Sequence, residues 1–302
     1  MLSFKDSINR IITRARQVSM PGFEDIPIYD VIVFFLKGLR NGALTTRASS
    51  IAFNFFLAFP PAIIFFYTLI PFLPFDNFQL GLSNLIESIL PMEVDQFINS
   101  LLDDMFVKRK VVHIFGLLTA LVFAMNGMNG MVLAFNASYH TVETRPWFER
   151  RLIALVMVII LFTMINSATM LIIFSGIIVR RLVEMEVMTT GLTFYVLYIG
   201  KWLIILALIF FAISFIYYYA PSRKTRWKFY SPGSALASLL FILTSLGFSG
   251  FINGFNRFNE FFGSMGTLMI IMIWLYLNSL AVLIGFELNA SIKNAKLDMD
   301  SI

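Results

Sequence analysis

The chain has 302 residues, of which 58% are hydrophobic and only 14% are charged. A typical soluble domain is about 45–50% apolar and about 25% charged, so this composition excludes an ordinary water-soluble fold. The absence of Cys excludes disulfide frameworks and thiolate metal sites. With a net charge of +5 and a mean hydropathy of +0.80, the chain fits a protein that crosses a membrane several times.

The first 47 residues are predicted to form a cytoplasmic segment, because the beginning of the chain lacks the apolar core of a secretory signal peptide. Between Ile28 and Leu39 the apolar residues recur at helical spacing, which predicts a short amphipathic helix. This helix is too short to span a bilayer. It either lies in the membrane interface or packs on the other helices, and the sequence favours neither alternative.

Six stretches without Asp, Glu, Lys or Arg reach the length of about 20 residues that a membrane-spanning helix needs. They cover residues 48–75, 111–142, 152–179, 202–222, 229–256 and 261–286, and the fourth can be extended back through Lys201 to Val187. Their continuous apolar character favours helices over the alternating strands of a membrane β-barrel. We therefore predict an all-α integral membrane protein, a six-transmembrane-helix bundle with an N-terminal interfacial helix and a helical extracytoplasmic loop. The membrane domain would cover residues 48–290, with the external loop at 76–110 and a cytoplasmic tail at 291–302.

The distribution of basic residues predicts the orientation of this bundle. Sixteen of the 23 Lys and Arg residues fall on one side of the six spans and six fall on the other, with Lys201 unassigned. Because basic residues accumulate on the cytoplasmic side, both termini are expected in the cytoplasm. The even number of spans agrees with this arrangement.

The sequence contains no motif for familiar catalytic chemistry. It has two His, and lacks a zinc-protease HExxH motif, a phosphate-binding loop, a serine-hydrolase elbow and a dinucleotide glycine pattern. We therefore expect no enzyme activity, no cofactor and no metal site. The pairs Gly127 and Gly130, and Gly250 and Gly254, have the spacing of close helix contacts, which we favour over phosphate binding.

Charged groups at membrane depth need partners, because each one costs about 2.5–3.5 kcal/mol at the centre of the bilayer. Arg47 begins the first span and Glu287 ends the last, so we expect both at the same cytoplasmic depth. We predict an ion pair between them, with Asn136 and Asn289 supplying hydrogen bonds. This cluster would either line a substrate path or only fix the register of the helices.

Three further charged residues have two interpretations each. Lys201 would be desolvated and attract an anionic headgroup if its helix begins near Leu192, and would extend to the interface if the helix begins near Ile199. Arg257 and Glu260 lie in a predicted external turn where polar residues alternate with Phe. This turn is either an aromatic belt with a polar tip or a partly re-entrant hairpin that lines an external opening.

Four segments carry a resemblance to a known family. They are RASSIAFNFFLAFPPAII from Arg47, NASYHTVETRPWFERRL from Asn136, YYYAPSRKTRWKFYSPGSALAS from Tyr217, and FFGSMGTLMIIMIWLYLNSLAVLIGFELNA from Phe261. Together they resemble the YihY/virulence factor BrkB family, in order and over nearly the whole chain. The resemblance implies a six-span bacterial inner-membrane protein with an export-like or lipid-handling role. Family members also carry the older name ribonuclease BN.

Two functions fit these features. The first is a transporter or flippase-like exporter of an amphiphilic, anionic, lipid-like molecule, which would move through a polar cleft between helices. The alternative is a structural or scaffold protein of the cell envelope with no transport activity. Membrane lipids are the expected partners, with the amphiphilic anion as substrate and a homo-oligomer left open. No nucleic-acid partner is expected, because the orientation rule accounts for the basic residues.

Overall fold

The computed structural model describes residues 18–20, 22–23, 26–41, 43–69, 110–138, 143–185, 190–222, 229–254 and 264–300. Within these ranges the chain forms seven helices and one isolated β-bridge between Ser19 and Pro27. The helices are α2 (Ile28–Asn41), α3 (Leu44–Leu69), α6 (Lys110–Ser138), α7 (Trp147–Glu184), α8 (Thr190–Tyr219), α9 (Pro232–Gly254) and α11 (Ser264–Asp300). The predicted all-α class is confirmed for these ranges. Apart from residue 110, the predicted external loop lies outside them.

Each of the six predicted spans coincides with one helix, from α3 to α11. Four of these helices are long and apolar enough in the described residues to cross a bilayer, over Trp147–Gly176, Tyr195–Tyr219, Pro232–Phe251 and Leu268–Met299. Helices α3 and α6, with 26 and 29 residues, also exceed the length of about 20 residues that a span requires. The structure thus describes an all-α membrane protein with at least four candidate spans.

Helix α11 is the central element of the fold. Its apolar stretch is 56% buried, against 17% for the stretch in α8. It packs against α9, α3 and α2, and more lightly against α6. The largest core cluster includes side chains from α3, α6, α7, α8, α9 and α11. The helix continues without a break to Asp300, so the predicted tail at 291–302 is largely the end of α11.

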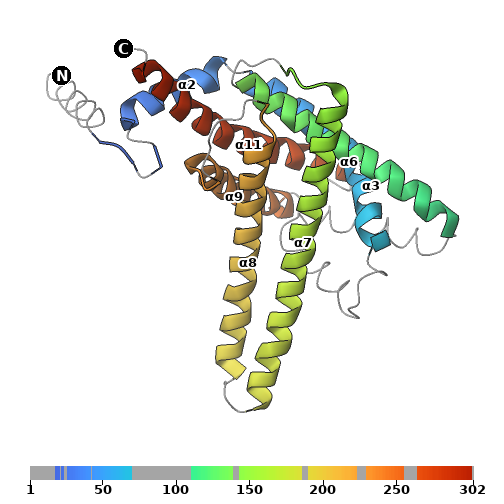
Figure 1. The fold of residues 1–302 in the computed structure, drawn as a ribbon. Coiled ribbons are helices and arrows are strands. Elements are labelled where there is room, and N and C mark those ends of the chain that lie inside the picture. Colours follow the sequence, from blue (N-terminus) through green and yellow to red (C-terminus); the bar gives the residue numbers. More distant parts are fainter. Residues whose placement is uncertain are drawn as a thin grey trace.

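Helices α7 and α8 form a long antiparallel hairpin that extends away from the other helices (Figure 1). Large apolar side chains along it are exposed, among them Leu171 at 59%, Ile178 at 57% and Leu203 at 60%. Contiguous apolar surface of this kind is unfavourable in water and is expected where a helix faces lipid hydrocarbon. The hairpin therefore has the surface of a membrane-inserted element.

The short helix α2 packs on the C-terminal part of α11. Val31 is fully buried and Ile26 is 2% exposed, in a small cluster that includes Ile292 and Ala295. Packing on the bundle, one of the two alternatives from the sequence, is therefore present. The other side of α2 still exposes Ile32, Val33 and Leu36, an apolar face of the kind that interfacial helices insert among lipids.

Candidate functional site

Arg47 and Glu287 lie together where α3 begins. Arg47 Nη2 is 3.4 Å from Glu287 Oε2, and the two side chains are 10% and 7% exposed. Arg47 Nη1 also donates to the carbonyl of Ala134 at 3.1 Å and to the hydroxyl of Ser138 at 2.5 Å. One guanidinium thus joins α3, α6 and α11. Charged hydrogen bonds of this kind compensate for removing both charges from water.

Helix α2 covers this pair from one side. A methyl group at Gly38 would lie 2.9 Å from the Cγ and Cδ atoms of Glu287, so only glycine gives the carboxylate room there. On the apolar side, Phe286 stacks on Phe135 with ring centroids 4.2 Å apart, and Tyr217 meets both rings edge-on. The pair therefore lies between an overlying helix and an aromatic layer, away from water.

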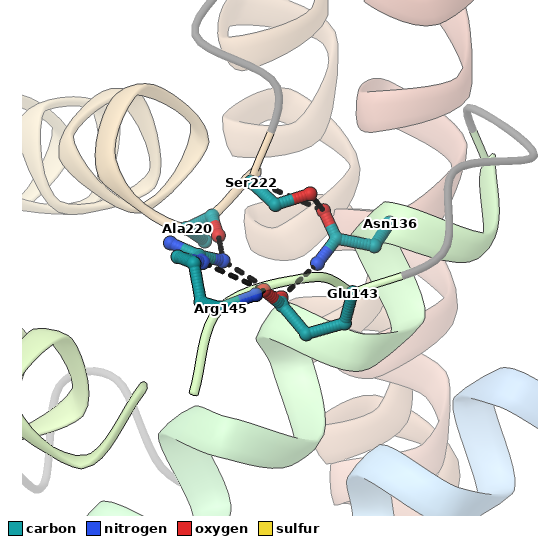
Figure 2. Close-up of polar contacts among 5 residues, drawn as sticks. All are labelled: Asn136, Glu143, Arg145, Ala220 and Ser222. Atoms are coloured by element: carbon teal, nitrogen blue, oxygen red, sulfur yellow. Dashed lines mark hydrogen bonds and ion pairs between the residues drawn. The ribbon is translucent and has the colours of Figure 1, made fainter. Parts of the chain in front are cut away.

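A second polar cluster ties the end of α6 to the start of α7 and the end of α8 (Figure 2). Glu143 accepts two bonds from the Arg145 guanidinium, from Nε at 2.7 Å and from Nη2 at 2.8 Å. Arg145 Nη2 also donates to the carbonyl of Ala220 at 2.9 Å. Asn136 donates to Glu143 and accepts from the backbone N–H of Ser222 at 2.8 Å. The cluster holds the base of the α7–α8 hairpin against α6.

Glu143 keeps its charge in this cluster although it is shielded from water. Burial by itself would raise the pKa of its carboxyl group. The hydrogen bonds and charge of Arg145, with the charge of Arg150, outweigh burial and hold the pKa below its ordinary value. Glu143 therefore stays ionised at neutral pH and contributes to holding the hairpin in place.

The two predicted amides bond to other partners than the ion pair. Asn136 belongs to the cluster around Glu143. Asn289 accepts from the backbone N–H of Gly233 at 2.9 Å and donates to the hydroxyl of Ser231 at 2.8 Å, which ties α11 to the start of α9. Both are almost fully buried, at 2% and 1% exposure. We call Arg47, Asn136, Glu143, Arg145, Glu287 and Asn289 the polar layer.

The structure does not bring the remaining predicted residues into the polar layer. Lys201 is half-buried on α8, six residues after the apolar stretch begins at Tyr195. It lies 19 residues before Ala220 on a continuous helical path, a separation of about 28 Å along the axis. Arg257 and Glu260 lie outside the described residues.

A polar cavity between α3 and α6 was not predicted from the sequence. It has a volume of about 300 Å³ and begins beside Arg47. Its lining also includes Ser50, Asn54, Asn126 and Asn129, together with Gly130, Leu133, Ala134 and Ala137. The sequence features that indicate this cavity are three Asn residues inside two apolar runs, Asn54, Asn126 and Asn129. Singly, each such amide is more often a helix contact, and only their spacing on facing helices reveals a cavity.

The structure confirms a helix contact at one of the two predicted glycine pairs. Added methyl groups at Gly127 and Gly130 would meet α3, at 3.5 Å from Phe55 and 3.0 Å from Asn54, so both glycines lie at a helix contact as expected. A methyl group at Gly250 would meet nothing within 4 Å among the described residues, and the surroundings of Gly254 are not described, so a helix contact at this pair stays a prediction. Close packing of α9 uses Gly233, where an added methyl would overlap Asn289 of α11.

The site offers hydrogen bonds and charge for binding a molecule. Within the described ranges, no group of three or more Asp, Glu or His could hold a metal ion. The described groups are a buried ion pair, an ionised carboxylate held by arginine, and amides that line a cavity.

Comparison with known proteins places these features in a family. The family described as Virulence factor BrkB matches residues 35–301. The chain belongs to this family. A putative ribonuclease-like protein YfkH from Bacillus subtilis (strain 168) is 28% identical over 252 residues, 83% of this chain and 90% of that protein. A UPF0761 membrane protein from Vibrio campbellii (strain ATCC BAA-1116) is 30% identical over 112 residues, 37% of this chain and 34% of that protein. No solved structure matches the chain.

Proposed function

We propose that this BrkB-family protein crosses the bacterial inner membrane six times, with both termini in the cytoplasm, and relocates an amphiphilic anion. The observation that carries the proposal is the cavity of about 300 Å³ beside the buried Arg47–Glu287 pair. In an otherwise apolar bundle, buried polar groups of this kind mark paths for polar substrates. The exposed apolar surface of α7 and α8 supports the membrane-inserted part of the proposal.

The proposed substrate is lipid-like because of what surrounds the cavity. Leu133 lines it and is 43% exposed, and on α3 Phe53 and Leu57 are 54% and 43% exposed. A molecule with an acyl chain would keep its chain among these side chains and in the bilayer while its polar end enters the cavity. Positive charge from Arg47 and Arg151 favours an anion.

The proposal is of binding and movement, with no chemical transformation. The sequence offers no nucleophile, metal or nucleotide motif. The ribonuclease-like name of the Bacillus subtilis relative is that protein's name, and we infer no nuclease role for this chain. Material purified free of soluble nucleases is expected to leave RNA intact.

The function is tested with purified protein in liposomes. A fluorescent anionic phospholipid is placed in both leaflets, and a membrane-impermeant quencher is added outside. Movement predicts quenching beyond half of the signal at a rate that rises with protein content, while a zwitterionic lipid moves more slowly. Equal rates in protein-containing and empty liposomes, for a panel of anionic amphiphiles, would favour the scaffold role in place of transport.

A further inference from the structure

The cavity between α3 and α6 is a groove with a polar stripe on α3 and, on α6, two Asn residues followed by apolar residues. On α3, Arg47, Ser50 and Asn54 recur at intervals of three and four residues, so they share one face of the helix. On α6 the lining residues Asn126, Asn129, Leu133 and Ala137 follow the same rule. The lining residues on α6 run from Asn126 to Ala137, which is 12 residues and about 16 Å of helix. The groove is therefore long enough for a headgroup of several polar atoms.

Several hydrogen-bonding groups along this groove lack partners in the described structure. Arg47 Nε is buried there without an acceptor. Asn54 uses its N–H on the Ser50 carbonyl at 2.8 Å, which leaves its side-chain oxygen as an acceptor. Asn129 makes no hydrogen bond to any described residue, so both ends of its amide are available. A buried polar atom without a partner is unfavourable, and a ligand that hydrogen-bonds at the groove would offset part of that cost.

The charge of the groove favours a ligand with a negative group. The charge of Arg47 is balanced by Glu287. Arg151 donates to Asn126 at 2.5 Å and lies 5.5 Å from the Trp147 ring centroid, and no described carboxylate pairs with it. Arg151 does not itself line the groove, but its positive charge lies next to the lining residue Asn126. Guanidinium N–H groups match phosphate oxygens well.

The amide oxygens add a second requirement. Asn54 and Asn129 both present an acceptor, so the ligand must also bring donors. An ammonium group would be disfavoured by the positive charge of Arg151 beside the groove, whereas hydroxyl groups carry no charge and can both donate and accept. A headgroup with a phosphate and free hydroxyl groups satisfies every group that the groove leaves open.

We propose that the α3–α6 groove binds the headgroup of an anionic phospholipid that carries free hydroxyl groups, with its phosphate at the Arg47 end of the groove and its hydroxyls against Asn54 and Asn129. This proposal rests on the proposed function, because it names the class of lipid that the cavity would bind as substrate. A lipid is favoured over a free phosphate ester because the exposed Leu133 lines the groove, beside exposed Phe53 and Leu57 on α3.

The test is a binding titration of the purified full chain in detergent, followed by native mass spectrometry. The probes are phosphatidylglycerol, phosphatidic acid, which is anionic without headgroup hydroxyls, and phosphatidylethanolamine. We expect phosphatidylglycerol to bind at least about tenfold more tightly than either other lipid, equivalent to ~1.4 kcal/mol. Equal binding of phosphatidylglycerol and phosphatidic acid would overturn the assigned hydroxyl recognition.

Variants then locate the site. Asn129→Leu removes both amide groups from the groove and is expected to weaken phosphatidylglycerol binding by about tenfold, while Asn129→Gln keeps most of the binding. The matched control is Asn166→Leu, which removes an amide whose hydrogen bond within the described residues stays inside α7, to the Phe162 carbonyl. Melting temperatures verify that all three variants fold. Unchanged binding in folded Asn129→Leu, or equal losses in both leucine variants, would overturn the site.

Two further comparisons separate this proposal from its alternatives. Free glycerol 3-phosphate is expected to leave the melting temperature unchanged. Protection by it equal to that by the lipid would show that the ligand is a soluble phosphate ester.

Binding that follows the pattern above in a protein that moves no lipid would contradict transport and support the groove. Lipid movement unaffected by Asn129→Leu would contradict the groove and leave transport standing.

Discussion

The buried charges of Arg47 and Glu287 are the residues on which the site most depends. Each stabilises the other, and Arg47 also bonds to Ala134 and Ser138. Removing one partner leaves the other charge buried and uncompensated, at a cost of about 3–5 kcal/mol, whereas removing both leaves no charge to compensate. The two effects should therefore not add.

We expect Arg47→Gln and Glu287→Gln each to lower the detergent melting temperature strongly, and the double variant to recover much of the loss. The measurement is a double-mutant cycle of melting temperatures in one detergent. A double variant as unstable as the sum of the two single variants would contradict the pairing.

The lowered pKa of Glu143 predicts how the stability of the folded protein depends on pH. Its pKa is held below its ordinary value by Arg145, against the opposite effect of burial. A group with a lowered pKa in the folded state stabilises that state above its unfolded pKa of about 4.3, and loses this contribution as the pH falls through the folded value. Its contribution should therefore be complete at neutral pH.

The melting temperatures of wild type and Glu143→Gln are compared between about pH 7 and pH 3. We expect the wild type to melt higher at pH 7, and the difference to shrink once the pH falls below about 4.3. A difference that stays constant over this range would show that the carboxylate charge is not what stabilises the folded state.

At the scale of helices, α9 packs closely on α11. A methyl group at Gly285 would lie 2.5 Å from Ala237 Cβ and 2.8 Å from Tyr217 Oη, so something in the core would have to move. Overpacking of this kind costs about 1–3 kcal/mol. Gly250 on α9 offers a matched comparison, since a methyl group there would meet nothing within 4 Å.

Gly285→Ala is therefore expected to lower the melting temperature, and Gly250→Ala to leave it unchanged or raise it slightly. Both variants are measured in the same detergent and lipid mixture. Equal effects of the two substitutions would contradict the close packing of α9 on α11.

The helices were predicted well because continuous apolar runs are a strong signal, whereas their ends were not. The fourth charge-free run starts at residue 202 and could be extended back through Lys201 to Val187, and only the structure places the start of α8, at Thr190. Likewise α7 begins at Trp147, ahead of Glu149, Arg150 and Arg151. Charged residues end the apolar part of a helix without ending the helix itself, because their side chains can extend toward water.

The site was predictable only in part. Placing Arg47 and Glu287 together needed only their matching depths, which follow from the ends of two spans. The partners of Asn136 and Asn289 depend on how the loops before α7 and α9 fold back, and no periodicity describes that. Glu143 and Arg145 were overlooked because the basic residues of their loop were considered only for the orientation of the helices in the membrane.

At the scale of the whole molecule, the proposed orientation fixes which ends of the helices face the cytoplasm. The turn after α7 and the loop before it would lie on opposite sides of the membrane. Met185, 71% exposed, marks the first, and the exposed Thr144 marks the second. Because the chain has no Cys, single introduced cysteines report their own location.

Met185→Cys is expected to react with a membrane-impermeant thiol reagent supplied to the periplasmic side of intact cells, and Thr144→Cys only after the inner membrane is opened. Both should react in detergent. Reaction of Thr144→Cys alone in intact cells would reverse the proposed orientation.

The central claim is that the site beside Arg47 moves an amphiphilic anion. Its most direct test is the rate of anionic phospholipid movement in liposomes that contain wild type, the Arg47→Gln/Glu287→Gln double variant or Asn166→Leu, each shown to be folded. The account predicts that the folded double variant loses most of the movement while Asn166→Leu retains it. A folded double variant that moves the lipid as fast as wild type would contradict the claim.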